Sequence, residues 1–173
     1  EIPFLSEGPD GEVLASNSQI TVINRGKADM LFPGTVFTVL GRRKGGALYP
    51  KGIIKVTVVE DETSTGRMIE LASASDPIVK GDLIQSATYS PDRTLSFVLL
   101  GEFTRLGKND LAARLRSLGA EVHASVQPTT HYLVIGMPGA GQDNLEGTEA
   151  YQAAQRYGIQ ILTENQLASF TRF

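Results

Sequence analysis

The stretch VHASVQPTTHYLVIG, residues 122–136, places a polar run directly before an apolar one. The Thr-Thr-His run at residues 129–131 leads into YLVI at residues 132–135, which predicts a buried strand. Such a polar run is compatible with a catalytic or metal-binding cluster, and equally with the polar entry to a strand. We interpret it as the entry, because neither this histidine nor His123 has a pair of carboxylates at ligand spacing.

Outward from this strand, the C-terminal half alternates between strand and helix patterns. Leu111, Leu115 and Leu118 recur at helical spacing and share one face. The expected strands are 97–103, 120–126, 131–136 and 159–162, and the expected helices are 108–119, 147–158 and one that opens at Thr163. Strands joined through helices form parallel sheets. The prediction is an α/β domain with a four-stranded parallel sheet, helices on both faces and the order β-α-β-β-α-β-α.

The helix ends in this half carry their own signals. Gly119 and Gly158 are placed to stop the first two helices in the left-handed conformation. Thr163 and Gln166 have the spacing of a capping box at the start of the last helix. The side chains expected to point inward from the last two helices are Tyr151, Ala154, Tyr157, Leu167 and Phe170.

The N-terminal half has a different pattern, in which short runs rich in Val, Ile and Thr are separated by residues typical of turns. The expected strands are 19–24, 35–40, 52–60, 66–72 and 82–87. Turn residues separate them, among them Pro33-Gly34 and Pro50-Lys51-Gly52. Short strands at this spacing predict a small antiparallel barrel, which closes its own edges.

The segment TYSPDRTLS, residues 88–96, is expected to link two domains, because Pro91 and Asp92 are poor strand residues. We place a β-barrel domain with an N-terminal tail at residues 1–91 and the α/β domain at residues 92–173. The first carries nine Lys and Arg against eleven Asp and Glu, and the second seven against eight. Neither domain has the basic excess that is typical of nucleic-acid binders.

The composition excludes several kinds of site. The chain of 173 residues has no cysteine, which removes disulfides, thiolate nucleophiles and cysteine-bound zinc. No apolar run approaches the roughly 20 residues of a membrane span. The Gly-rich loop at residues 136–147 lacks the spacing of a phosphate-binding loop, and no nucleophile-elbow pattern occurs.

The C-terminal half, from about residue 95 to residue 173, resembles the BRCT domain. The residues that carry the resemblance are FVLLGEFTR, LRSLGAEV, SVQPTTHYLVIG, AYQAAQRYGIQIL and TENQLASF. The N-terminal half is more weakly similar to small β-barrel modules of bacterial envelope and flagellar-assembly proteins, through ITVINRGKADMLFPGTVFTV. The first resemblance implies a cytoplasmic protein. The second implies a bacterial, envelope-associated one.

The BRCT resemblance also points to candidate residues. Phosphopeptide-binding members use a Ser or Thr beside a Gly after the first strand and a Lys at the second helix. Here Leu100 precedes Gly101, and Glu149 or Ala150 falls where the Lys would be, which disfavours phosphopeptide binding. The remaining candidates for anion or partner binding are the Gly101 backbone, Thr104, Arg105, Lys108 and Arg116.

We expect a non-enzymatic interaction or scaffold module with no catalytic residues, metal or cofactor and no small-molecule substrate. Its expected partner is another protein. The alternative is a DNA-associated accessory module that binds DNA ends or phosphate, as the resemblance to ligase and clamp-loader BRCT domains implies, although the net charge of −3 disfavours it. Because the chain begins at Glu1 and not at methionine, we expect a processed product or an expressed fragment. Its compartment stays open, since removal of an N-terminal anchor is compatible with a membrane-anchored or envelope-associated protein.

Overall fold

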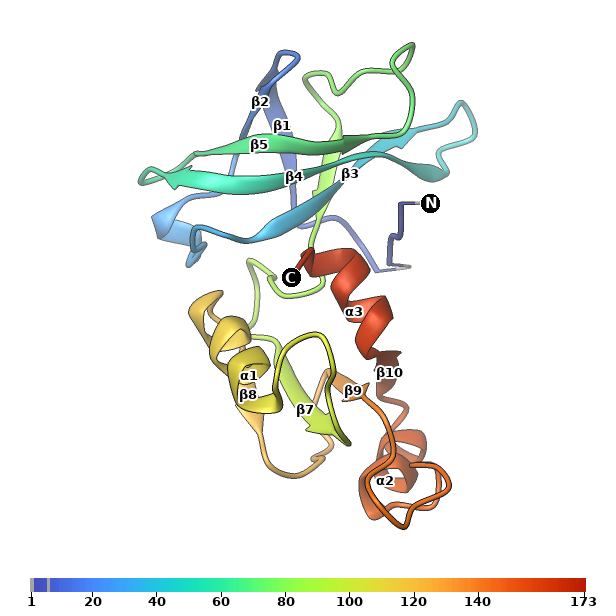
Figure 1. Cartoon of the computed structure of the whole chain (residues 1–173). Coiled ribbons are helices and arrows are strands. Elements are labelled where there is room, and N and C mark those ends of the chain that lie inside the picture. Colours follow the sequence, from blue (N-terminus) through green and yellow to red (C-terminus); the bar gives the residue numbers. More distant parts are fainter. Residues whose placement is uncertain (1, 6) are drawn as a thin grey trace. The chain divides into compact units, whose positions relative to one another are not determined.

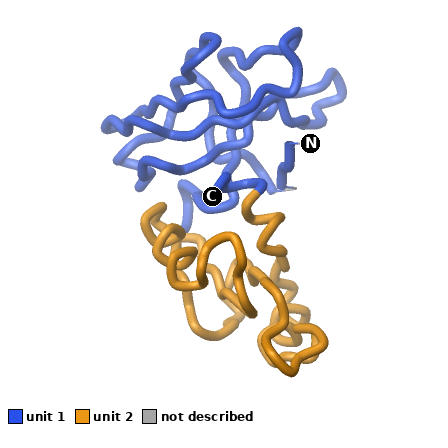
Figure 2. Tube along the Cα trace, in the orientation of Figure 1, with its two compact units in different colours: residues 1–93, 169–173 blue, residues 94–168 orange. Residues whose placement is uncertain are grey.

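The computed structural model describes residues 2–5 and 7–173. The chain divides into two compact units, which are coloured separately in Figure 2. Unit 1 comprises residues 1–93 together with 169–173, and unit 2 comprises residues 94–168. None of the helices within the described residues has the length and apolar character that crossing a bilayer requires.

Unit 1 is built on a closed, antiparallel barrel of six strands (Figure 1). Going around the barrel, the order is β1-β2-β5-β4-β3-β6. The strands are β1 (Gly11–Ser16), β2 (Ile20–Ile23), β3 (Val36–Arg42), β4 (Leu48–Val59), β5 (Ser64–Leu71) and β6 (Leu83–Gln85), with a short 3-10 helix η1 (Lys27–Asp29). The predicted barrel is confirmed. β1 was not among the expected strands, because its sequence GEVLAS offers only two large apolar residues to the pattern.

The expected turn at Pro50-Lys51-Gly52 is wrong, because β4 runs through these residues. Opposite them, Val39 pairs with Gly52 and Leu40 pairs with Pro50, so Lys51 is the extra residue of a β-bulge. A bulge is one of the few places where a strand accepts a proline, which has no N–H to donate. The sequence signal of a turn was therefore a signal of a bulge.

The barrel interior is filled by alternating residues of its strands. The core consists of Val13, Ile23, Leu31, Phe37, Val39, Ile54, Val56, Ile78, Ile84 and Tyr89. The Tyr89 ring meets Phe37 edge-on at 5.8 Å, and its hydroxyl donates to the Asp29 carbonyl at 2.8 Å. The start of the expected linker is therefore anchored in the barrel, and its exposed part is residues 92–94.

Unit 2 is a parallel four-stranded sheet with the order β10-β9-β7-β8. Its strands are β7 (Ser96–Leu100), β8 (Glu121–His123), β9 (Tyr132–Ile135) and β10 (Gln160–Thr163). They alternate with the helices α1 (Lys108–Ser117) and α2 (Glu149–Tyr157), and α3 (Glu164–Thr171) follows β10. The predicted parallel sheet with helices is confirmed, and β8 lies at its edge.

Side chains of the sheet alternate between two apolar layers. On one face, Val98 and Leu133 pack against Ala154 of α2. On the other face, Phe97 and Tyr132 stack with their ring centroids 5.1 Å apart. Leu99 of that same face lines a cleft together with Ala112 of α1. Helices therefore cover both faces, because α1 and α2 contact residues of opposite parity along β7.

The predicted helix ends are found, but two predicted inward side chains are not. Gly119 and Gly158 have φ of 91° and 68°, and Thr163 and Gln166 exchange side chain-to-backbone bonds of 2.8 and 3.1 Å. Leu111, Leu115, Leu118 and Leu167 are buried as expected. Tyr157 is 43% exposed, because it is the last residue of α2 and stands where the helix leaves the sheet, and Phe170 is only half-buried.

Candidate interaction site

Gly101 directly follows β7 and serves the backbone of the turn. Its φ is 94°, and a Cβ there would come within 2.6 Å of the Met137 carbonyl oxygen. The next residue, Glu102, forms a two-way backbone bridge with Met137, with N–H to O distances of 2.8 and 2.7 Å. This close approach of two chain segments explains the glycine without any ligand.

Thr104 and Arg105 lie in the loop after β7, where their polar groups converge on one carboxylate. Glu164, the first residue of α3, accepts the Arg105 N–H at 2.6 Å and the Thr104 N–H at 3.1 Å. The Thr104 hydroxyl also donates to it at 3.3 Å. Burial acts to raise the pKa of Glu164, but these hydrogen bonds outweigh it and hold the pKa below its usual range. Of the predicted anion donors, Thr104 is thus engaged by an internal carboxylate, which also accepts the backbone N–H of Arg105.

Lys108 and Arg116 come together in a cleft of about 300 Å³ between α1 and β8. They stand in the first and last turns of α1, whose buried face of Leu111, Ala112 and Leu115 fixes the orientation of the helix. The other residues that line this cleft are Leu99, Asn109, Ala112, Val122, His123 and Ala124. Arg105 is not among them, so the structure brings together two of the three predicted cations.

Hydrogen bonds hold the edge of this cleft. The Arg116 guanidinium donates to the Val122 carbonyl at 3.1 Å, which ties α1 to the edge strand. His123 lies 3.0 Å from the Glu121 carboxylate, and its side chain is half exposed. The α1 cleft, as we call it, therefore combines an apolar floor of Leu99, Ala112, Val122 and Ala124 with two cationic residues whose backbone positions are about 12 Å apart along the helix axis.

The comparisons with known proteins bear on this same unit. Residues 91–169 match the family model of the BRCA1 C Terminus (BRCT) domain. Residues 91–169 are a BRCT domain. The chain is 36% identical over 86 residues to a DNA ligase of Colwellia psychrerythraea, a match that covers 50% of this chain and 11% of the ligase.

Two further ligases match in the same way. A DNA ligase of a Bradyrhizobium species is 36% identical over 78 residues, which are 45% of this chain and 10% of the ligase. A DNA ligase of Finegoldia magna is 28% identical over 121 residues, or 68% of this chain and 16% of the ligase. The chain therefore spans roughly a tenth to a sixth of the length of these relatives.

Among solved structures, one of an NADH-dependent reduced ferredoxin-NADP oxidoreductase aligns at 11% identity with a TM-score of 0.28. That alignment covers 92% of this chain and 58% of the other, and a score so low carries no inference. The comparisons thus identify the BRCT domain. For the barrel, the resemblance to envelope and flagellar-assembly modules stays a prediction.

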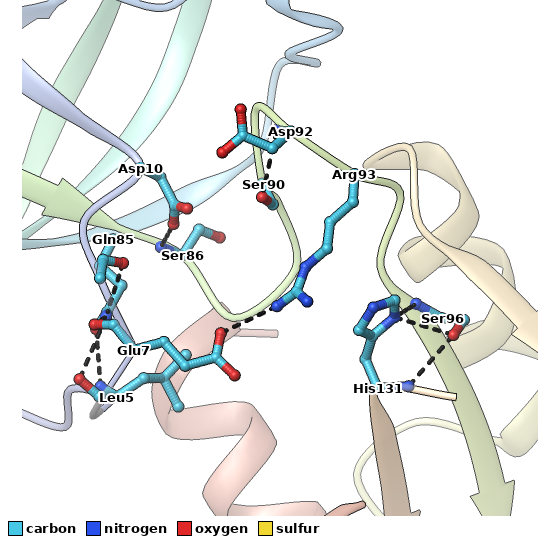
Figure 3. Close-up of polar contacts among 11 residues, drawn as sticks. Leu5, Glu7, Asp10, Gln85, Ser86, Ser90, Asp92, Arg93, Ser96 and His131 are labelled. Atoms are coloured by element: carbon cyan, nitrogen blue, oxygen red, sulfur yellow. Dashed lines mark hydrogen bonds and ion pairs between the residues drawn. The ribbon is translucent and has the colours of Figure 1, made fainter. Parts of the chain in front are cut away.

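In this BRCT domain the Thr-Thr-His run has the structural role that its sequence indicated. His131 Nδ1 accepts the Ser96 N–H at 3.0 Å, and the Ser96 hydroxyl donates to the Thr129 carbonyl at 3.2 Å (Figure 3 shows the His131–Ser96 pair). The Thr130 hydroxyl accepts the Gln127 N–H at 2.9 Å. These bonds connect the entries of β7 and β9. Within the residues that the structure describes, no three His, Cys, Asp or Glu are grouped to hold a metal ion.

The BRCT domain also has a second cleft that sequence reasoning missed. It measures about 310 Å³ and is lined by residues 124–126 and by Glu149, Ala150, Ala153, Arg156 and Tyr157 of α2. The Arg156 guanidinium lies over the exposed Tyr157 ring, 5.3 Å from its centroid. Ala124, just beyond β8, lines this α2 cleft and the α1 cleft alike. The exposed tyrosine was the available signal, but its helical spacing suggested the core.

Proposed function

We propose that this protein is a non-enzymatic interaction module whose BRCT domain binds an extended, acidic segment of a partner protein at the α1 cleft. The observation that carries the proposal is that Lys108 and Arg116 share one cleft with an apolar floor. Cations beside apolar surface suit a peptide that carries both carboxylates and an aliphatic side chain.

The spacing of the two cations defines the peptide. Eight residues of helix separate Lys108 from Arg116, which is about 12 Å. In an extended chain, residues four apart are about 13 Å apart and point to the same side. A carboxylate at each end of a five-residue segment therefore reaches both cations, while the central side chain faces the floor between them.

The neighbouring α2 cleft supports a protein partner. Exposed tyrosine and arginine are the residue types that contribute most at protein interfaces, and Tyr157 and Arg156 line a cleft that shares Ala124 with the first. A segment that leaves the α1 cleft past Ala124 enters this second cleft. The partner then covers the exposed Tyr157 ring of this chain in addition to making ionic contacts with Lys108 and Arg116.

DNA binding is the second candidate, and it is supported by the relatives, which are DNA ligases. Against it, the α1 cleft contains two cations and not three, and Glu164 already occupies the N–H and hydroxyl of Thr104 and the backbone N–H of Arg105. A module associated with DNA repair can act by binding another protein. We therefore propose that the α1 cleft contacts a protein segment, whether or not the whole protein acts near DNA.

The test is a titration of the isotope-labelled chain with the capped peptide Glu-Ser-Leu-Ser-Glu, followed by NMR. We expect amide shifts concentrated at Ala112, Arg116 and His123, and at least a tenfold weaker affinity, about 1.4 kcal/mol, for Lys108→Ala/Arg116→Ala. Arg114→Ala is the matched control, since Arg114 is on the same helix but not in the cleft lining. Equal binding of a peptide with Gln in place of Glu contradicts the proposal.

A further inference from the structure

An N-terminal segment, residues 2–5 and 7–8, is held against the barrel by the Gln85 side chain. The Gln85 amide oxygen accepts the Leu5 N–H at 2.7 Å, and its nitrogen donates to the carbonyls of Leu5 at 3.2 Å and Glu7 at 2.6 Å (Figure 3). The Gln85 residue is only 3% exposed. Its amide thus contacts both backbone groups of one residue, as a neighbouring strand does.

A second buried side chain continues this backbone recognition. The Thr38 hydroxyl donates to the Pro3 carbonyl at 3.1 Å, and Thr38 is directly opposite Gln85 in the pairing of β3 with β6. Both point out of the barrel, because Phe37 and Ile84, their neighbours in sequence, belong to the interior core. Two adjacent outward side chains therefore bind the backbone of three residues of the segment, Pro3, Leu5 and Glu7, whatever their side chains are.

Apolar contacts add selectivity. Ile2 is 6% exposed and packs against Val36 and Ile53, which alternate with core residues and so face outward, with Ile69 alongside. Leu5 is also buried, whereas Phe4 between them is 45% exposed. The outer surface of a barrel normally faces water. Here the side chains of Ile2 and Leu5, three residues apart, are buried, so we interpret this surface as one that accepts two apolar side chains at that spacing.

The barrel does not need this segment to close its sheet. β6 pairs with β1 on one side and with β3 on the other, so no backbone edge is left for a seventh strand. Pro3 also has no N–H to donate to a ladder. The face is therefore formed by the barrel alone, and the segment is attached to it by side chains.

We propose that this outer face of β3, β4 and β6 is a docking face for an extended segment of a partner protein with Ile or Leu at two positions three residues apart. Residues 2–5 are its internal ligand. A tethered segment competes at an effective concentration in the millimolar range, so a free peptide binds the intact chain weakly and binds strongly once the internal segment is released.

The experiment compares the wild-type chain with the variant Ile2→Asp/Leu5→Asp, whose own N-terminal segment cannot bind the docking face. The probe is the fluorescein-labelled peptide EIPFLSEG, and its anisotropy is measured against chain concentration. We expect the variant to bind the probe at least tenfold more tightly than the wild type does. Adding Gln85→Ala must remove that gain, and a probe that carries both Asp substitutions must not bind.

Equal probe binding by the wild type and the released variant overturns the proposal, as does no binding by either. If circular dichroism shows that the released variant is unfolded, hydrogen exchange of the wild type replaces it. Excess unlabelled peptide must then accelerate exchange of the Leu5 N–H, and unchanged exchange overturns the proposal. Dimerisation of the wild type that the double substitution abolishes overturns the assignment to a partner protein in favour of a second copy.

Discussion

The Glu164 carboxylate accepts the backbone N–H of Arg105 at 2.6 Å, so the BRCT domain supplies its own anion to the loop after β7. The same carboxylate is bonded to Thr104, and its pKa lies below the usual range. Glu164 opens α3, where a negative charge also interacts favourably with the helix dipole. One side chain therefore fixes the loop, begins the last helix and occupies the donors of an anion site.

The first prediction concerns this carboxylate. Because the folded-state pKa of Glu164 is lowered, its contribution to stability is present above the unfolded value of 4.5 and is lost as pH falls through the folded value. We expect Glu164→Gln to cost about 1 kcal/mol at pH 7 and to unfold with a shallower acid limb. Urea unfolding from pH 3 to 7 measures this. Parallel acid limbs in the two proteins contradict it.

The second prediction concerns Asp10, whose carboxylate accepts the Ser86 N–H at 2.9 Å (Figure 3). Burial, with smaller contributions from Glu7 and Asp92, raises the pKa of Asp10 to about 7 against the opposing effects of the Ser86 N–H and Arg25. The folded state therefore holds a proton that the unfolded chain has released, and stability falls as pH rises from about 4 to about 7. Ionised Asp10 is destabilising above that window.

Asp10→Asn keeps an oxygen for Ser86 and removes the charge. We expect it to stabilise the protein by roughly 1 kcal/mol at pH 8, which is well below the full linkage value because Asp10 is only partly buried. At pH 5 the two proteins should differ little. The check is the urea midpoint at both pH values, and a difference between the proteins that does not grow with pH refutes the role of Asp10.

The third prediction concerns Lys51, the bulge residue of β4. Its ammonium lies 2.7 Å from Asp82 and 3.4 Å from Asp76, and both Lys51 and Asp82 are largely buried. Lys51→Met leaves a buried carboxylate without its partner and should cost about 3 kcal/mol. Lys51→Met/Asp82→Asn should recover part of that loss, since the amide can still accept the Val79 N–H. Additive losses in the double-mutant cycle show that the pair is not coupled.

The fourth prediction concerns the link between the units. Residues 92–94 are exposed, while Tyr89 on one side and Leu95 on the other are buried. We expect limited trypsin to cut first after Arg93 and to release a stable fragment that begins at Thr94. N-terminal sequencing and mass spectrometry identify the cut. A protease-resistant chain, or a first cut inside the barrel, rules out two separable domains.

Much of the fold was predictable because the spacing of apolar residues and the residue types at turns and helix ends depend only on neighbouring sequence. The change from short strands to helical spacing gave the barrel and the parallel sheet, and Gly119, Gly158 and Thr163 gave the helix ends. The errors came where the structure of a segment is decided by the strand that pairs with it and not by its own sequence. Pro50 stays in the strand, beside the bulge residue Lys51, only because the register shifts between Val39 and Leu40 opposite.

The site was less predictable for the same reason. Lys108 and Arg116 were found because they share one helix face, but Glu164 is 59 residues from Arg105 and its carboxylate had no visible partner in the sequence. The Gln85 contact with Leu5 spans 80 residues. Polar side chains that bind distant backbone leave no periodic pattern, so only the folded chain reveals them.

The most direct test of the central claim is a fluorescence-anisotropy titration with a 5′-phosphorylated DNA duplex at about 150 mM salt. If the α1 cleft binds a protein segment, DNA affinity should be weak, independent of the duplex end and similar for Arg114→Ala and Lys108→Ala/Arg116→Ala. Sub-micromolar binding that requires the duplex end, falls with a log–log salt slope near −2 for two phosphate contacts and is lost only in the double variant contradicts the account.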